Sequence, residues 1–127
     1  MVMNFVCHDE IPAGMELKSI ILVDDADWQV GIPLSIWASV WWGRQTEWCT
    51  RHDIASFESY DRQGQLIVFR KAGPAFGESQ SWQLHPATGE FRDQHNRRAS
   101  WRGFLQRHPE LAGRLMAAFA LRLTGER

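Results

Sequence analysis

Residues 66–85, LIVFRKAGPAFGESQSWQLH, contain the strongest strand signal in the chain. Leu66 to Phe69 is a short run of apolar and β-branched residues, and Ser81 to His85 is a second extended segment. Between them, residues 73–77 begin with Gly-Pro and have the composition of a loop. The two runs therefore predict an antiparallel β-hairpin with a long loop.

Upstream of this hairpin, the pattern predicts two further strands and a helix. Residues 19–23 and 28–32 are both extended in pattern and are separated by an acidic turn. From Pro33 the period changes to a helical one, and a proline suits the first turn of a helix. We expect a helix over residues 33–42. Asp53 can then cap a short helical turn that precedes the hairpin.

Downstream of the hairpin, a brief extended piece from Glu90 to Arg92 is followed by helices. Ser100 can cap a short helix, and Pro109 opens another. The apolar stripe of this last helix consists of Leu111, Leu115, Met116, Phe119 and Leu123. Strands and helices are partly segregated, without βαβ alternation. The expected fold is α+β: one domain over residues 1–127, with a small antiparallel sheet packed against a Trp-rich helix and C-terminal helices.

The bulk composition is that of a folded domain. The 127 residues include 44% hydrophobic and 23% charged side chains, and no apolar run approaches the roughly 20 residues that cross a bilayer. No basic segment followed by an apolar one opens the chain, so we expect a cytoplasmic protein without contact with a membrane. The two cysteines, Cys7 and Cys49, are expected to be reduced there.

Charge is distributed unevenly along the chain. Residues 1–30 hold six acidic side chains against Lys18 alone, whereas residues 92–127 hold eight arginines against three acids. Either end could bind an oppositely charged partner. Alternatively, the two regions pack against each other or are simply solvated.

Five arginines between residues 92 and 107 form the most donor-rich segment. Together with Trp42, which falls about 100° around a helix from its neighbour Trp41 and is expected to be exposed, they form the predicted partner-binding set: Arg92, Arg97, Arg98, Arg102 and Arg107. Such a surface could contact phosphate or an acidic protein. Direct nucleic-acid binding remains an alternative, although a sequence pI near 6.5 is unlike that of a typical nucleic-acid binder. The other tryptophans of this region, Trp37, Trp41 and Trp48, are expected in the core.

Cys49 and two later residues supply the side-chain types that cysteine catalysis uses. A thiol, an imidazole and a carboxylate occur in the order Cys49, His85, Asp93, which is the set that cysteine catalysis requires. We expect the turn at residues 86–89 to bring His85 close to Asp93. In the competing interpretation, Cys49 is a small buried side chain that reacts slowly.

Metal and cofactor signals are weak. Cys49 and His52 have C-x2-H spacing, and His85 and His95 could complete a ligand set, but two tight ligand pairs are absent. No Gly-rich phosphate loop, HExxH or GxSxG motif occurs. We expect no bound metal and no cofactor.

The order of motifs resembles a group of small bacteriophage and prophage proteins that share a Trp-Cys-Thr motif. The similarity extends from about residue 28 to 111 and is most specific at Trp48-Cys49-Thr50 and from Gln83-Leu84-His85 to Asp93. Arg51 and Arg92 depart from the residues common in the group. The resemblance implies a phage or prophage setting and brings no activity with it.

These observations favour a small phage-type accessory protein that binds a host protein or nucleoprotein complex in the bacterial cytoplasm, as a regulator or an inhibitor of host defence. The alternative is a cysteine-dependent hydrolase or transferase that uses Cys49, His85 and Asp93. The two hypotheses differ in geometry, because an enzyme needs the three side chains to converge in an open cleft.

Overall fold

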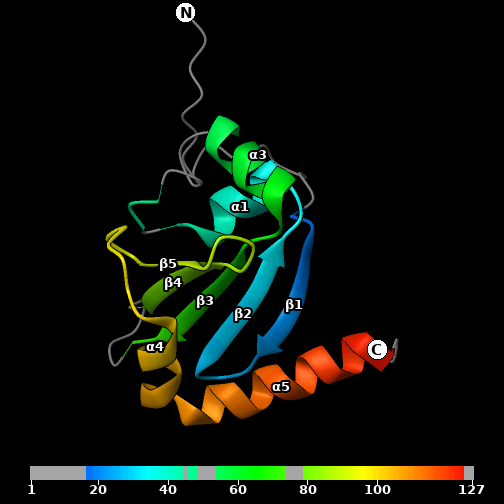
Figure 1. Cartoon of the computed structure of the whole chain (residues 1–127), viewed down its shortest axis with the longest axis vertical. Helices are drawn as coiled ribbons and strands as arrows, with labels where there is room; N and C mark the ends of the chain where they lie inside the picture. Colours follow the sequence, from blue (N-terminus) through cyan, green and yellow to red (C-terminus); the bar gives the residue numbers. More distant parts are fainter. Residues whose placement is uncertain (1–16, 45, 49–53, 74–78, 125–127) are drawn as a thin grey trace, which may run out of the picture.

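The computed structural model describes residues 17–44, 46–48, 54–73 and 79–124, and Figure 1 shows them in colour. The elements follow in the order β1 (Ser19–Asp24), β2 (Trp28–Pro33), α1 (Ile36–Trp42), α3 (Ile54–Gln63), β3 (Ile67–Ala72), β4 (Ser79–His85), β5 (Glu90–Asp93), α4 (Trp101–Arg107) and α5 (Pro109–Thr124). The strands form one antiparallel sheet in the order β1-β2-β3-β4-β5. The expected α+β class and the predicted hairpin are confirmed. Of the helices in these ranges, none is long and apolar enough to cross a membrane.

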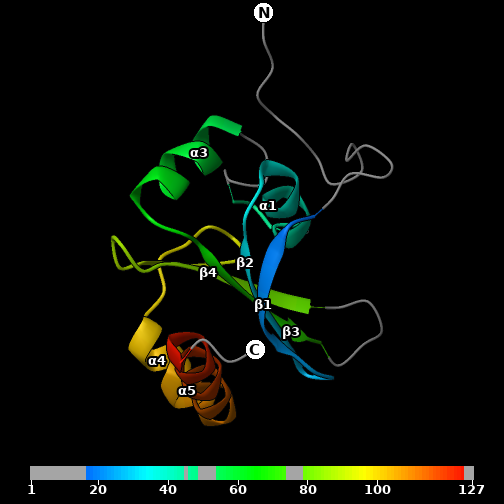
Figure 2. The same ribbon diagram turned by 90° about the vertical axis from the view of Figure 1, so that its right-hand side faces the viewer.

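The two faces of the sheet are covered by different helices (Figure 2). One face carries Val30, Phe69 and Trp82, which are cross-strand neighbours, and packs against α4 and α5. The opposite face carries Val68, which packs with side chains of α1, and His85, which touches Tyr60 of α3. Successive strand residues point to opposite faces, so the register decides which helices each side chain meets. This alternation also decides on which face of the sheet each predicted site residue lies.

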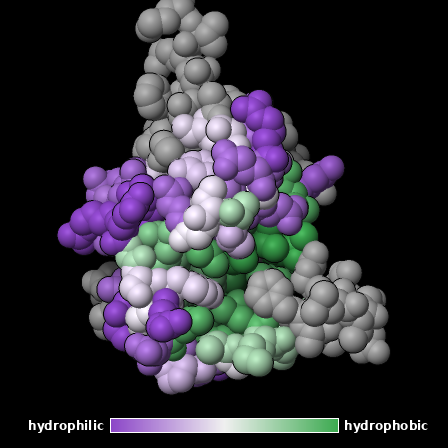
Figure 3. All heavy atoms as spheres, in the orientation of Figure 1, coloured by the Kyte–Doolittle hydropathy of each residue, from purple (hydrophilic) through white to green (hydrophobic). Residues whose placement is uncertain are grey.

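An aromatic cluster fills the α4/α5 face. Phe104 of α4 is fully buried, and its ring centroid lies 4.8 Å from that of Trp82, 5.1 Å from Phe91 and 5.5 Å from Phe69. Ser100 caps α4 as expected, because its hydroxyl accepts a hydrogen bond of 3.0 Å from the Gly103 amide. Some apolar surface stays visible over the sheet between α3 and α5 (Figure 3). The cap and the cluster together fix the chain that leads out of β5.

The helix α1 begins three residues later than the sequence predicted. Pro33 is the last residue of β2, and Ser35 is the N-cap, accepting a hydrogen bond from the Ala38 amide at 3.2 Å. Proline fits both the end of a strand and the first turn of a helix, since it has no amide proton to donate. The preceding strand therefore continues up to the cap.

The expected orientation of the tryptophans on α1 is wrong. Trp42 is only 3% exposed, because its ring lies on Gly31 of β2 and its indole N–H donates to Ser19 Oγ at 2.8 Å. Trp37 and Trp41 are half-buried, and the guanidinium of Arg44 stacks 3.7 Å from the Trp41 ring centroid. Trp42 is therefore a core residue and cannot serve as a surface anchor.

The apolar stripe of α5 is confirmed in part. Leu111 and Leu115 are buried against the sheet, whereas Met116 is 74% exposed. The side chains of Phe119 and Leu123 lie outside the described residues. Met116 follows Leu115 directly and so projects about 100° away from the buried line of the helix.

The surroundings of His108, at the junction of α4 and α5, predict that the stability of the protein depends on pH. Its ring packs against those of Trp28 and Phe104, at 5.1 and 5.0 Å. Burial is the main cause that lowers the pKa of His108 below its usual value; Lys71 and Arg107 add to the effect and Glu110 opposes it. A lowered folded-state pKa means that the unfolded chain binds the proton more tightly.

The His108 contribution to stability should thus be complete above the unfolded pKa of about 6.5 and be lost as the pH falls below it. Urea denaturation at pH 8 and pH 5.5 measures this loss. His108→Gln, which cannot titrate, should show a smaller difference between the two pH values than the unmodified protein. Equal differences would show that His108 is not the responsible group.

Candidate functional site

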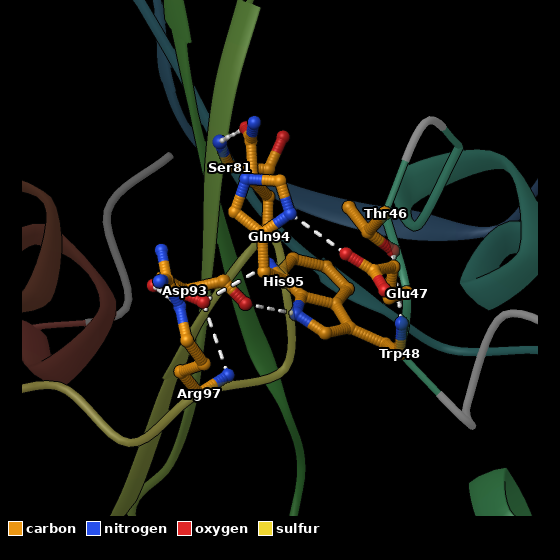
Figure 4. A network of polar contacts seen from close by, with 8 residues as sticks. All are labelled: Thr46, Glu47, Trp48, Ser81, Asp93, Gln94, His95 and Arg97. Carbon is orange, nitrogen blue, oxygen red and sulfur yellow. Dashed lines mark hydrogen bonds and ion pairs between the residues drawn. The ribbon is translucent and has the colours of Figure 1, made fainter.

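The polypeptide just before Cys49 is fixed to the end of β5 (Figure 4). The indole N–H of Trp48 donates to the carbonyl oxygen of Asp93 at 2.7 Å. The backbone amide of Glu47 donates to the carbonyl oxygen of Gln94 at 2.8 Å. Trp48 is fully buried, as expected. The Trp-Cys-Thr motif is thus anchored at its first residue by the turn after β5. Cys49 and Thr50 lie outside the described residues.

Asp93 organises that turn. Its Oδ1 accepts hydrogen bonds from the amides of His95 and Arg97 at 2.9 and 3.0 Å, and its Oδ2 pairs with the Arg97 guanidinium at 3.1 Å. Burial raises the pKa of Asp93, but these donors outweigh it and leave the pKa below its usual value. Asn96 completes the turn in the left-handed conformation, with φ of 61°. The carboxylate is occupied by its own loop.

His95 projects from the same turn onto the segment that carries Trp48. Its Nδ1 lies 2.7 Å from Oε2 of Glu47, and both side chains are largely exposed (Figure 4). The side-chain oxygen of Gln94 accepts from the Ser81 amide at 3.1 Å. These contacts hold together three segments that are remote in sequence. A small pocket of about 210 Å³ lies between the turn and the start of β4.

His85 is a buried structural residue, only 1% exposed. Its Nε2 lies 3.0 Å from the carbonyl oxygens of both Tyr60 and Gly64, and its Nδ1 lies 2.8 Å from Thr88 Oγ1. Because carbonyl oxygens only accept hydrogen bonds, Nε2 carries a proton. The imidazole thereby links the end of α3 to the β4–β5 turn.

The expected contact between His85 and Asp93 is wrong. The turn does fold β5 back along β4, but His85 pairs with Glu90 and Asp93 pairs with Trp82. Three residue steps separate these pairs, about 10 Å along the strand, and an odd separation places the two side chains on opposite faces. Both are also occupied by other partners. His85 and Asp93 therefore do not form the pair that the catalytic hypothesis requires, and Cys49 lies outside the described residues.

The described residues hold no group of three or more His, Cys, Asp or Glu side chains that could bind a metal ion. Of the weak ligand set noted in the sequence, His85 is buried in one hydrogen-bonded site and His95 pairs with Glu47. Cys49 and His52 lie outside the described residues.

A cleft of about 830 Å³ separates α3 from the β4–β5 turn and the segment after β5. On its floor, the hydroxyl of Tyr60 donates to Glu90 Oε2 at 2.6 Å, and the Arg92 guanidinium pairs with Glu90 Oε1 at 2.9 Å. Burial raises the pKa of Glu90, but these two donors, with Arg92 and His85 nearby, hold the pKa below its usual value. The carboxylate is thus ionised and satisfied at neutral pH. Arg98 lines the same cleft.

Sequence reasoning missed this cleft. Its α3 wall consists of Ser56, Ser59, Tyr60 and Gln63, a polar line at helical spacing. That spacing is visible in the sequence. Nothing in the sequence shows, however, that this line faces the β4–β5 turn across open space.

The arginine segment divides into two groups. Arg92 and Arg97 pair with Glu90 and Asp93. Arg98, Arg102 and Arg107 are exposed, and no carboxylate of the described residues lies within ion-pair distance of them. The second group is hereafter called the free arginines.

The acidic turn after β1 is partly engaged within the molecule. Asp25 accepts hydrogen bonds from the amides of Asp27 and Trp28, both at 2.9 Å, and pairs with Arg114 of α5 at 2.6 Å. The amides are the largest cause of its lowered pKa. The acidic and basic regions therefore touch here, which was one of the alternatives left open by the charge distribution. Asp24 and Asp27 remain exposed.

Comparisons with protein-family models, with curated proteins and with solved structures give no match to this chain.

Proposed function

We propose that this domain is a small accessory protein that binds an acidic macromolecular partner through the free arginines, Arg98, Arg102 and Arg107. One observation supports the proposal above all: three arginines between residues 98 and 107 are exposed, without carboxylate partners in the described residues. In the phage setting that the Trp-Cys-Thr resemblance implies, the partner is a host protein or nucleoprotein complex. The domain would then act as a regulator or an inhibitor of host defence.

Arginine suits this role because its planar guanidinium makes bidentate contacts with carboxylates and phosphates. The free arginines are also held on an ordered backbone. Arg98 forms a β-bridge to Arg92, and Ser100 caps the helix that carries Arg102 and Arg107. Little backbone entropy is then lost when a partner binds.

Charge reversal tests the proposal. Arg98→Glu combined with Arg102→Glu should abolish capture of the partner from a bacterial host lysate while the free energy of unfolding changes by no more than about 0.5 kcal/mol, since both side chains are exposed. The matched control, Lys18→Glu with Arg62→Glu, makes the same change in net charge at exposed positions outside the free arginines. Capture should persist in the control.

Two outcomes would contradict the proposal. Equal losses in both double variants would mean that net charge matters and the surface does not. Loss on changing Asp24 and Asp27 to lysine, with no effect of the arginine reversals, would place binding at the acidic turn.

A further inference from the structure

The cleft beside α3 has the dimensions of a ligand site. Its volume of about 830 Å³ lies within the range of small-molecule and peptide pockets, roughly 300 to 1,000 Å³. The α3 wall extends from Ser56 to Gln63, about 10 Å at about 1.5 Å per helical residue. An extended peptide rises about 3.3 Å per residue. The wall therefore spans about three residues of extended chain.

The charge in the cleft favours an anionic ligand. Glu90 is already neutralised by Arg92 and by the hydroxyl of Tyr60. Arg98, which also lines the cleft, has no carboxylate partner in the described residues. An incoming carboxylate would satisfy the guanidinium in a charge-assisted pair, which is among the stronger polar contacts in proteins.

The remaining groups suit a peptide better than a nucleic acid. Single-stranded nucleic acids are held by stacking of bases on aromatic rings. Here the ring of Tyr60 packs edge-on against His85 at 4.9 Å, and Phe91 is buried in the core. Hydroxyl and amide side chains such as Ser59 and Gln63 can instead hydrogen-bond the main chain of a peptide.

We propose that this cleft binds an extended acidic segment of a protein partner, with a partner carboxylate on Arg98 and the peptide main chain along α3. The inference rests on the proposed function, because Arg98 belongs to the free arginines, and it adds a second contact surface. Arg102 and Arg107 are not among the described residues that line the cleft. Variants of α3 therefore test the cleft separately from the arginine surface.

Fluorescence anisotropy of a fluorescein-labelled, C-terminally amidated tetraglutamate peptide provides the measurement. Ser59→Trp fills the cleft without changing charge and should weaken binding by about tenfold or more, as should Arg98→Ala, by loss of the charge-assisted pair. Gln63→Trp is a second filling variant. Gln65→Trp, on an exposed residue outside the cleft, is the matched control and should bind within about twofold of the unmodified protein. Thermal denaturation checks that each variant is folded.

The outcomes separate the two proposals. If Ser59→Trp and Gln63→Trp bind as Gln65→Trp does, or if the unmodified protein does not bind tetraglutamate, the peptide cleft is overturned. If the arginine reversals still abolish partner capture, the proposed function stands without it. A pentathymidylate oligonucleotide that displaces the peptide with equal affinity would overturn the choice of a peptide.

Discussion

Replacing Gly31 with alanine will lower the free energy of unfolding by about 2 to 3 kcal/mol, the upper part of the range for overpacking a core. An added Cβ would lie 2.2 Å from Cζ2 and 2.6 Å from Cη2 of Trp42. The indole cannot easily withdraw, because its N–H bonds to Ser19 and its ring is buried. Urea denaturation monitored by tryptophan fluorescence gives the measurement.

A matched glycine provides the control. Gly113 lies in α5, and an added Cβ there would meet nothing within 4 Å. Gly113→Ala should therefore stabilise the protein by about 0.5 to 1 kcal/mol through helix propensity. Combining Gly31→Ala with Trp42→Leu should destabilise by less than the sum of the two single changes, because the clash disappears. Strict additivity would show that the two residues are not in conflict.

Replacing His85 with leucine will destabilise the protein by about 3 kcal/mol. The change removes the donor to the carbonyl oxygens of Tyr60 and Gly64 and leaves buried acceptors unsatisfied. Guanidinium denaturation measures the loss. His95→Leu, at an exposed turn position, is the control and should change stability by no more than about 0.5 kcal/mol. A His85→Leu protein as stable as the unmodified one would contradict the structural role.

Local chemistry was sufficient to predict the five strands and the starts of α4 and α5. The apolar β-branched run at Leu66 to Phe69 and the cap at Ser100 depend on a few adjacent residues, so each could be read from the sequence. The tryptophans of α1 could not. Their orientation depends on Gly31, a strand residue that leaves room for the Trp42 ring. Nothing within the helix itself indicates that space.

The expected contact between His85 and Asp93 was wrong for a related reason. The turn at residues 86–89 was predicted, but the pairing of His85 and Asp93 depends on register, and one step of register moves a side chain to the other face. The arginine segment was identified from composition alone. Which of its members are free depends on Glu90 and Asp93, and those carboxylates pair with only Arg92 and Arg97.

Amide hydrogen exchange, measured on the protein alone and in complex with its captured partner, tests the binding surface most directly. The free arginines predict slower exchange in residues 97–107, which include α4, when the partner is bound, and no change at the acidic turn from Asp24 to Asp27. Protection confined to the acidic turn, with residues 97–107 unchanged, would contradict an arginine-mediated interface.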